Sequence, residues 1–400
     1  MTFRKWLSGF TAGFVSLSGL GSNALAEDNP FVFSVEAVFS GAIVNAENPS
    51  YTQPFTGEIG LKLEKEHYFD NGVSVGFASE IRAQGDNSKR QTFAGELQFN
   101  ALNSTINDNS ASLLPLRRSP ATGLVAAMGE TDDGPYATFE QGFAYVKAGW
   151  GELSVGRDIG AATRLDARAP RVLKYSSPNS SRLNPIAFSS VRARNDVTGP
   201  SAKLTYMSPR LIGFRAGASF TPEANARGID FDASRDVLGI ANANLKNVVE
   251  AGLSFTHLFR ENDLRVRIGV TGIHAETDSI MNGFSNYESL GLGLEVEKGF
   301  WRLGTQYLDS NNAIDSGLGD YTAWETGISR EFSDWTVTAE YGHAIDELQA
   351  VKGENWGVGV SKPLNNNVNV GVGYISTKSK HFGTEIEGSG AIIELIVRYE

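Results

Sequence analysis

Apolar and polar residues alternate along much of this chain in stretches of about ten residues. The alternation is clearest in the C-terminal half, in Ser289–Val296, Trp301–Tyr307, Trp335–Tyr341 and Val368–Tyr374. A period of two residues is the pattern of a β-strand that has one apolar and one polar face. These stretches carry no helical spacing of apolar residues, so the pattern predicts an all-β protein and argues against an α/β fold.

Short turns and longer loops alternate between the predicted strands. The short turns are expected at Phe69–Gly72, Trp150–Glu152, Ser208–Arg210, Arg260–Asp263, Lys298–Gly299, Phe332–Asp334 and Leu364–Asn367. The longer segments fall at 46–54, 86–135, 159–192, 222–245, 277–285, 310–320, 346–353 and 379–384. Seven turns and eight loops join about 16 strands of an up-down meander, which favours a closed transmembrane antiparallel β-barrel. A sandwich or a propeller lacks this systematic alternation.

The two faces of the strands differ as a membrane barrel requires. Leu, Val, Trp and Tyr make the face expected to contact lipid, and Glu, Arg, Gln, Thr and Gly make the face expected to line a wet lumen. A charged side chain in place of Leu292 or Val370 is therefore expected to impair folding of the barrel. Serine in place of Gly293 is expected to leave folding normal. Aromatic residues gather beside the short turns, as an interfacial girdle would: Tyr68, Phe69, Trp150, Phe214, Phe259, Phe300, Trp301, Phe332 and Trp335.

The N-terminus has the features of a secretory signal peptide. Arg4 and Lys5 precede the modestly apolar stretch Trp6–Leu20, and Ala24-Leu25-Ala26 is a cleavage site of the A-x-A type. Residues 1–26 are expected to be removed, which leaves 27–400 as a single barrel domain. The alternative is an N-terminal membrane anchor, but a spanning helix needs about 20 apolar residues, and this stretch contains several Ser, Thr and Gly residues.

Composition narrows the chemistry. The chain has no cysteine, which excludes thiol catalysis and thiolate metal sites, and a barrel needs no disulfide because its closed ladder leaves no edge. Removing Arg4 and Lys5 leaves 33 basic and 46 acidic residues, a net charge of −13. That acidity argues against nucleic acid as a partner.

Two motifs form a further pattern: the segment Phe143–Arg157, which ends in Gly-Arg, and Arg194-Asn195-Asp196 followed by Lys203–Phe214. These motifs resemble the general porins of Gram-negative bacteria, the first their strand–turn–strand unit and the second the strand pair after their constriction loop. The last strand, Ala391–Glu400, resembles the C-terminal signal of outer-membrane proteins, although it ends on Glu400 and not on an aromatic residue. The resemblance implies a sixteen-stranded barrel in the outer membrane, a homotrimer, and passive diffusion of small hydrophilic solutes. It also implies contact with outer-membrane lipid, lipopolysaccharide and the assembly machinery of that membrane.

The resemblance further implies that the third external loop, 159–192, folds into the barrel and narrows it. It places basic residues of the constriction at Arg157 and Arg194, and Arg82, which follows Glu80, is expected to face the lumen. Strand alternation places Arg157 on the same face as Leu153 and Val155, which are expected to face lipid. A β-bulge near Gly156 is therefore needed to turn Arg157 inward.

This loop departs from the family pattern because it is basic. It carries Arg164, Arg168, Arg171, Lys174 and Arg182 against Asp158 and Asp166. The basic side chains either point into the pore or pair with carboxylates of the wall and anchor the loop. The inward carboxylates available for pairing are Glu58, Glu64, Glu80, Glu250, Glu295, Glu325 and Glu340.

Other functions find less support in the sequence. The loop arginines favour a porin selective for acidic solutes as the second hypothesis, and a barrel adhesin or enzyme is the third. The five histidines lack zinc-like spacing, and the acidic stretches 130–134 and 315–320 lack the EF-hand order, so we expect no catalytic residue, metal or cofactor. Whether 91–100 is a barrel strand or part of an external loop stays open.

Overall fold

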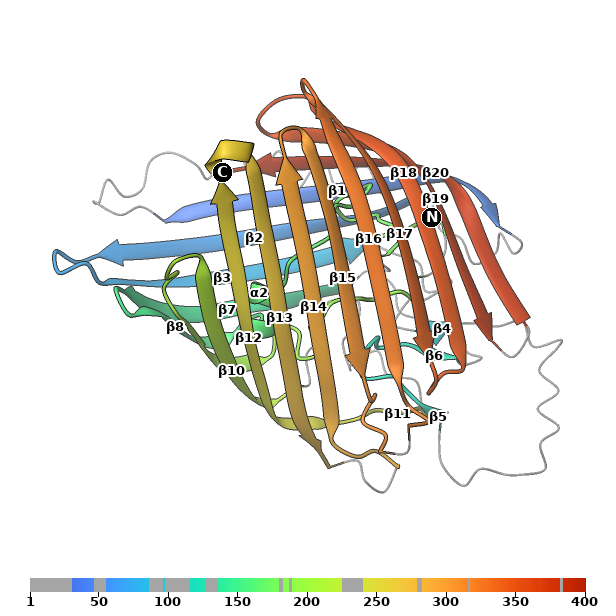
Figure 1. Ribbon diagram of the computed structural model, residues 1–400, viewed down its shortest axis with the longest axis horizontal. Coiled ribbons are helices and arrows are strands. Elements are labelled where there is room, and N and C mark those ends of the chain that lie inside the picture. The colour runs from blue at the N-terminus through green and yellow to red at the C-terminus, as the bar shows by residue number, and fades with distance from the viewer. Residues whose placement is uncertain are drawn as a thin grey trace.

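The computed structural model describes residues 31–46, 55–85, 96–97, 116–126, 136–179, 183–186, 189–224, 240–278, 283–315, 317–381 and 384–400. These residues form a closed barrel of sixteen antiparallel strands (Figure 1). The predicted fold class and strand number are confirmed. The predicted signal peptide, 1–26, lies outside the described residues.

The barrel strands follow one another round the wall in chain order. They are β1 (Val32–Ala46), β2 (Phe55–Tyr68), β3 (Ser74–Gly85), β7 (Tyr136–Ala148), β8 (Gly151–Arg157), β9 (Ala202–Met207), β10 (Phe214–Glu223), β12 (Leu245–Phe259), β13 (Leu264–Thr277), β14 (Tyr287–Lys298), β15 (Trp301–Ser310), β16 (Tyr321–Phe332), β17 (Trp335–Asp346), β18 (Val351–Pro363), β19 (Val368–His381) and β20 (Thr384–Tyr399).

Short elements outside the barrel lie in the longer loops. β4 (Glu96–Leu97) pairs with β6 (Val125–Ala126), and β5 (Leu116–Arg117) pairs with β11 (Ile240–Ala241). The part of 91–100 that is described therefore belongs to the loop between β3 and β7 and not to the barrel.

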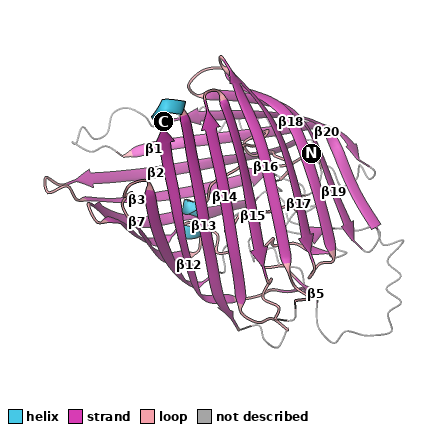
Figure 2. Cartoon of the chain, viewed as in Figure 1, coloured by secondary structure: helices cyan, strands magenta, loops and turns pink. Residues whose placement is uncertain are grey.

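Among the described residues, two short helices lie outside the strands. One of the turns contains the 3₁₀ helix η5 (Arg260–Asn262), and the helix α2 (Ala161–Leu165) lies within the ring of strands (Figure 2). No helix of the described part is long and apolar enough to cross a membrane.

The first and last strands close the barrel. β1 and β20 are paired from Val35 opposite Tyr399 to Ala46 opposite Gly388. Because β1 also pairs with β2 and β20 with β19, neither strand presents an open edge. Every strand thus satisfies its backbone N–H and C=O groups on both sides, which is the condition for crossing a bilayer with strands.

The predicted faces agree with the burial of the side chains. On β14, Leu290, Leu292 and Leu294 are 47%, 41% and 38% exposed, whereas Gly291 and Gly293 between them are buried. All nine aromatic residues expected at the rim of short turns are at least 43% exposed. The outer face is therefore apolar in the middle and aromatic at this rim, as a lipid-facing surface requires.

The inner face is not open water along its whole length, and this overturns one expectation. A Cβ atom at Gly293 would lie 2.3 Å from the carbonyl oxygen of Ala167, which belongs to the loop after β8. Gly293 is therefore not the open lumen position that was expected, and serine there would require the inner segment to shift. Gly60 on β2 also faces inward but has no atom within 3.6 Å of an added Cβ, so it is the inward position with room for a side chain.

Leu292→Arg and Val370→Arg should both impair assembly of the barrel, because a charge that faces the middle of the bilayer costs about 2–4 kcal/mol. Gly60→Ala is the matched inward control and should fold like the unmodified protein. The fraction of folded barrel can be measured by heat-modifiable migration on gels. Normal folding of both arginine variants together with failure of Gly60→Ala would invert the assignment of the two faces.

Candidate functional site

The chain between β8 and β9 lies against the inner wall of the barrel. We call its described residues, 158–179, 183–186 and 189–201, the inner segment. Its helix α2 contacts β9, β10, β12 and β13. The inner segment is longer than the predicted loop 159–192, because residues up to Ser201 make no barrel pairs. Arg194 consequently belongs to this segment and not to a strand of the wall.

A row of inward-facing glycines lies against the inner segment, and a Cβ atom at any of them would come within 3.0 Å of it. The added Cβ would meet backbone atoms of the inner segment at Gly269 (Leu165), Gly293 (Ala167), Gly304 (Ala169) and Gly327 (Pro170). It would meet side chains of the inner segment at Gly252 (Leu165), Gly359 and Gly373 (Val172) and Gly371 (Leu173). Glycine has no side chain, so another backbone can approach a strand closely there. We call these positions the glycine track; it runs over β12 to β16, β18 and β19.

Carboxylates of the wall hold the inner segment at its backbone. Glu394 on β20 accepts hydrogen bonds from the successive N–H groups of Lys174, Tyr175 and Ser176, at 3.0, 2.9 and 2.8 Å. Glu394 is 3% exposed. A buried carboxylate is costly unless it is paired or hydrogen-bonded, so this set of three donors explains how a charged residue can lie inside the wall.

Glu250 on β12 and Glu340 on β17 act in the same way. Glu250 accepts from the N–H of Ala162 at 3.1 Å, and Glu340 accepts from the N–H of Val172 at 3.2 Å and from the hydroxyl of Ser177 at 2.9 Å. The sequence identified Glu250 and Glu340 as partners for arginine side chains. The structure assigns most of their hydrogen bonds to backbone and hydroxyl groups instead.

The arginines of the inner segment divide into a paired group and an exposed one. Arg171 lies 3.4 Å from Glu325 on β16, and Arg164 lies 2.7 Å from Glu152 on β8 and also bonds Asp158. Arg171 thus anchors the inner segment to β16, and Arg164 anchors it to β8 and to its own first residue, Asp158. Lys174 likewise lies 3.3 Å from Glu36 on β1, and Arg182 is outside the described residues.

Arg168 differs from these arginines because its side chain is exposed to the lumen. The guanidinium of Arg194 lowers the pKa of Arg168 to about 10. Arg194 is partly exposed, and a carboxylate oxygen of Asp196 is 4.0 Å from it. Asp196 also bonds Arg192 at 2.9 Å. The charges of Arg168 and Arg194 therefore repel each other, and Asp166 and Asp196 are the carboxylates that act against this repulsion.

Asp166 is the other carboxylate near this pair, and it is buried. Its Oδ2 accepts a hydrogen bond of 2.5 Å from Gln306 on β15. Burial raises the pKa of Asp166 to about 7, although Arg194 and Arg168 act in the opposite direction. At neutral pH its carboxyl is therefore only partly ionised and balances only part of the positive charge.

Arg82 and Glu80 face the lumen on β3, as expected. Arg82 lies 2.7 Å from Glu58 and 3.0 Å from Glu80, so two carboxylates flank one guanidinium. Arg82 is 14% exposed and Glu58 is 1% exposed at the side chain. This cluster is consequently a set of paired charges in the wall, in contrast to the exposed Arg168.

Arg157 is not brought to Arg194. It pairs with Gly142 on β7 and with Ala202 on β9, and neither register shifts at Gly156. No register shift turns Arg157 inward, although Gly156 has a φ of 133°, and Arg157 shares its strand parity with Val155, which is 59% exposed. Its Nε donates to the carbonyl of Glu140 at 3.1 Å.

Within the described residues, no group of three or more His, Asp and Glu residues could hold a metal ion. The arrangement instead consists of a closed wall, an inner segment fixed to that wall, and exposed cationic side chains beside the remaining lumen. Those are the parts of a water-filled passage whose charge is set at its narrow part.

Comparison with known proteins identifies the family. The chain is 20% identical to an uncharacterized protein of Rickettsia prowazekii over 338 residues. The aligned region covers 66% of this chain and 74% of that protein. Its fold is similar to that of OmpF of Salmonella typhi in complex with daunomycin, with a TM-score of 0.57 at 12% identity, over 94% of this chain and 99% of that one. It is also similar to the fold of the anion-selective porin from Comamonas acidovorans, with a TM-score of 0.54 at 13% identity, over 93% and 100% of the two chains.

The model of the Gram-negative porin family matches residues 55–381, which is most of the barrel. This chain therefore belongs to the Gram-negative porins and is a protein of the outer membrane.

Proposed function

We propose that the protein is a homotrimeric pore through which small hydrophilic solutes and ions diffuse passively, with a preference for anions and acidic solutes. The observation that carries this preference is the exposed side chain of Arg168 beside Arg194. The anion-selective porin from Comamonas acidovorans and the trimer form of OmpT from Vibrio cholerae have the same fold, which makes both properties compatible with this architecture. We propose no catalytic reaction.

The physical reason is that fixed charge at a narrow, water-filled point sets the local concentration of counter-ions. The low-dielectric wall strengthens the field of such charges, and salt screens it within about 8 Å at physiological ionic strength. Among the described arginines of the inner segment, Arg164, Arg171 and Arg192 form close ion pairs, so we assign the charge that acts on passing ions to Arg168 and Arg194.

The double variant Arg168→Gln/Arg194→Gln should shift the reversal potential in a salt gradient toward cation preference. The measurement is made on purified protein in a planar bilayer. Asp315→Asn removes a charge from an exposed position of an external loop and should leave the reversal potential nearly unchanged. If the double variant behaved like the unmodified pore, Arg168 and Arg194 would not lie at the selective point.

Anion preference should decrease as the pH rises through about 7, because Asp166 then loses its proton and adds negative charge beside Arg168 and Arg194. Asp166→Asn should remove most of this dependence and keep the preference of the low-pH form. Reversal potentials recorded on either side of pH 7 test this. A pH dependence that Asp166→Asn leaves intact would have to come from another group.

The position of the inner segment should control the conductance. Gly327→Ala places a Cβ atom 2.0 Å from the carbonyl oxygen of Pro170, so it should push the inner segment off the wall toward the pore axis. We expect a lower single-channel conductance in a barrel that still folds, whereas Gly60→Ala should conduct normally. An unchanged conductance in folded Gly327→Ala would show that the glycine track does not position the inner segment.

A further inference from the structure

A second loop also enters the mouth of the barrel. Residues 116–126, which we call the strap, belong to the loop between β3 and β7. The strap pairs with β11 through β5, and the N–H of Arg118 continues this contact by donating to the carbonyl of Ala241 at 2.9 Å. Most of its contacts are with loops that join other strands, at the rim opposite the short turns.

Those partners lie on the far side of the barrel. β3 is the third of the sixteen strands round the wall, and β15 is the eleventh. They are eight places apart, which is halfway round a closed ring of sixteen. The strap bonds Asn312 in the loop after β15. The strap, which lies in the chain between the neighbouring strands β3 and β7, therefore contacts a loop on the opposite side of the barrel mouth.

Asn312 is the main polar anchor of the strap. Its Oδ1 accepts hydrogen bonds from the hydroxyl of Ser119 at 2.8 Å and from the N–H of Ala121 at 3.0 Å. Its Nδ2 donates to Asp346 at the end of β17, at 3.2 Å. Asn312 is fully buried and has a positive φ of 49°, a conformation that asparagine adopts more readily than most residues. The rim loop is thus shaped to direct this side chain at the strap.

Two further hydrogen bonds hold the start of the strap. Gln349 in the loop after β17 donates from Nε2 to the carbonyl of Arg117 at 2.6 Å. The guanidinium of Arg117 donates to the carbonyl of Gly283 in the loop before β14 at 3.1 Å. Together with Asn312, these contacts attach the strap to three different rim loops.

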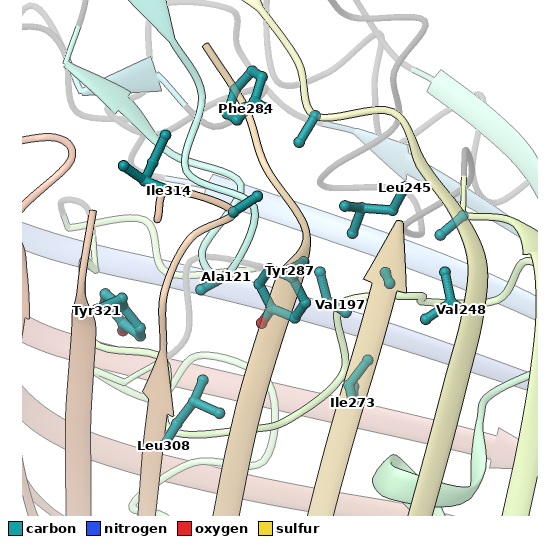
Figure 3. Packing of buried hydrophobic residues seen from close by; sticks show 14 of the residues in the cluster. Ala121, Val197, Leu245, Val248, Ile273, Phe284, Tyr287, Leu308, Ile314 and Tyr321 are labelled. Carbon is teal, nitrogen blue, oxygen red and sulfur yellow. The ribbon is translucent and has the colours of Figure 1, made fainter. Parts of the chain in front are cut away.

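Apolar packing fixes the middle of the strap. Ala121 is 4% exposed and belongs to a buried cluster with Ile314, Tyr287 and Tyr321 on the rim loops and strands (Figure 3). Val197 of the inner segment is part of the same cluster.

The end of the strap also packs on the inner segment. Leu124 is 3% exposed and lies in a second buried cluster with Val172, Leu173 and Ile186. The strap is therefore clamped between the rim and the inner segment below it, and it has the burial of a core element.

We propose that the strap is a fixed entrance filter, which covers part of the mouth and sets the size limit for solutes before they reach Arg168. This inference rests on the proposed function as a diffusion pore and adds a second selective point to it. Size is filtered at the strap and charge at Arg168 and Arg194. The two can be separated by experiment, since uncharged solutes report only on size.

The test uses the variant Ser119→Cys/Asn312→Cys. The natural chain has no cysteine, so the new pair is the only one that can form a disulfide, and the two side chains are in direct contact. In the reduced form the anchor of the strap is lost, and in the oxidised form the strap is tied back to the rim. Permeation of neutral sugars of increasing size is measured by swelling of liposomes that contain the purified pore, before and after reduction.

We expect the reduced form to admit larger sugars than the unmodified pore and the oxidised form to return to the original limit. Asn312→Ala should show the same increase without added reductant. Asn311→Ala is the matched control, because the side chain of Asn311 bonds Asn286, Glu288 and Ala313, which lie outside the strap; it should keep the original limit. Heat-modifiable migration verifies that each barrel is folded, and the oxidised pair keeps the test valid if Asn312→Ala fails to fold.

An identical size limit in the reduced, oxidised and unmodified pores would overturn the strap as a filter. A changed size limit with an unchanged reversal potential would support the strap and leave the charge preference to be tested separately by the Arg168/Arg194 variant. If the unmodified protein formed no pore at all, the proposed function and this inference would both be wrong.

Discussion

The closure of the backbone ladder between β1 and β20 is the constraint on which the rest of the structure depends. In the hydrocarbon layer no water can satisfy an exposed N–H or C=O group, so an open sheet edge is not tolerated. Pairing from Val35–Tyr399 to Ala46–Gly388 removes the last edge. Once the sheet closes, every strand has one lipid face and one inner face, and the inner face becomes a surface on which loops can be held.

The inner face of the barrel holds the backbone of the inner segment in two ways. Small residues such as Gly293 and Gly327 let the inner segment approach the strands closely, and buried carboxylates such as Glu394 accept its N–H groups. Both devices keep the irregular backbone inside the barrel, where it is covered by protein. Several wall carboxylates, among them Glu250, Glu325 and Glu340, are thereby committed to the inner segment, which itself carries the exposed side chain of Arg168.

The sequence predicted part of the candidate site, and the failures have identifiable causes. The face of Glu80 and Arg82 agrees with the prediction because period-2 alternation along β3 assigns it, even though the pairing with β7 shifts between Glu80 and Ile81. Arg157 was expected in the lumen on the basis of family resemblance, although its own parity argued for the outer face, and the uninterrupted register at Gly156 agrees with the parity. Arg168 and Arg171 could not be distinguished in advance, because a loop has no period that assigns its side chains.

The sequence by itself determined the all-β class, the sixteen strands, the seven turns and the two faces, because these follow from local alternation and turn chemistry that act over a few residues. Only the tertiary structure decided what fills the lumen. That Ala167 lies on Gly293, that Arg171 meets Glu325, and that the strap reaches Asn312 halfway round the barrel are contacts between residues far apart in the chain. They exist because closure brings distant strands round a common interior, and no local pattern encodes which loop occupies it.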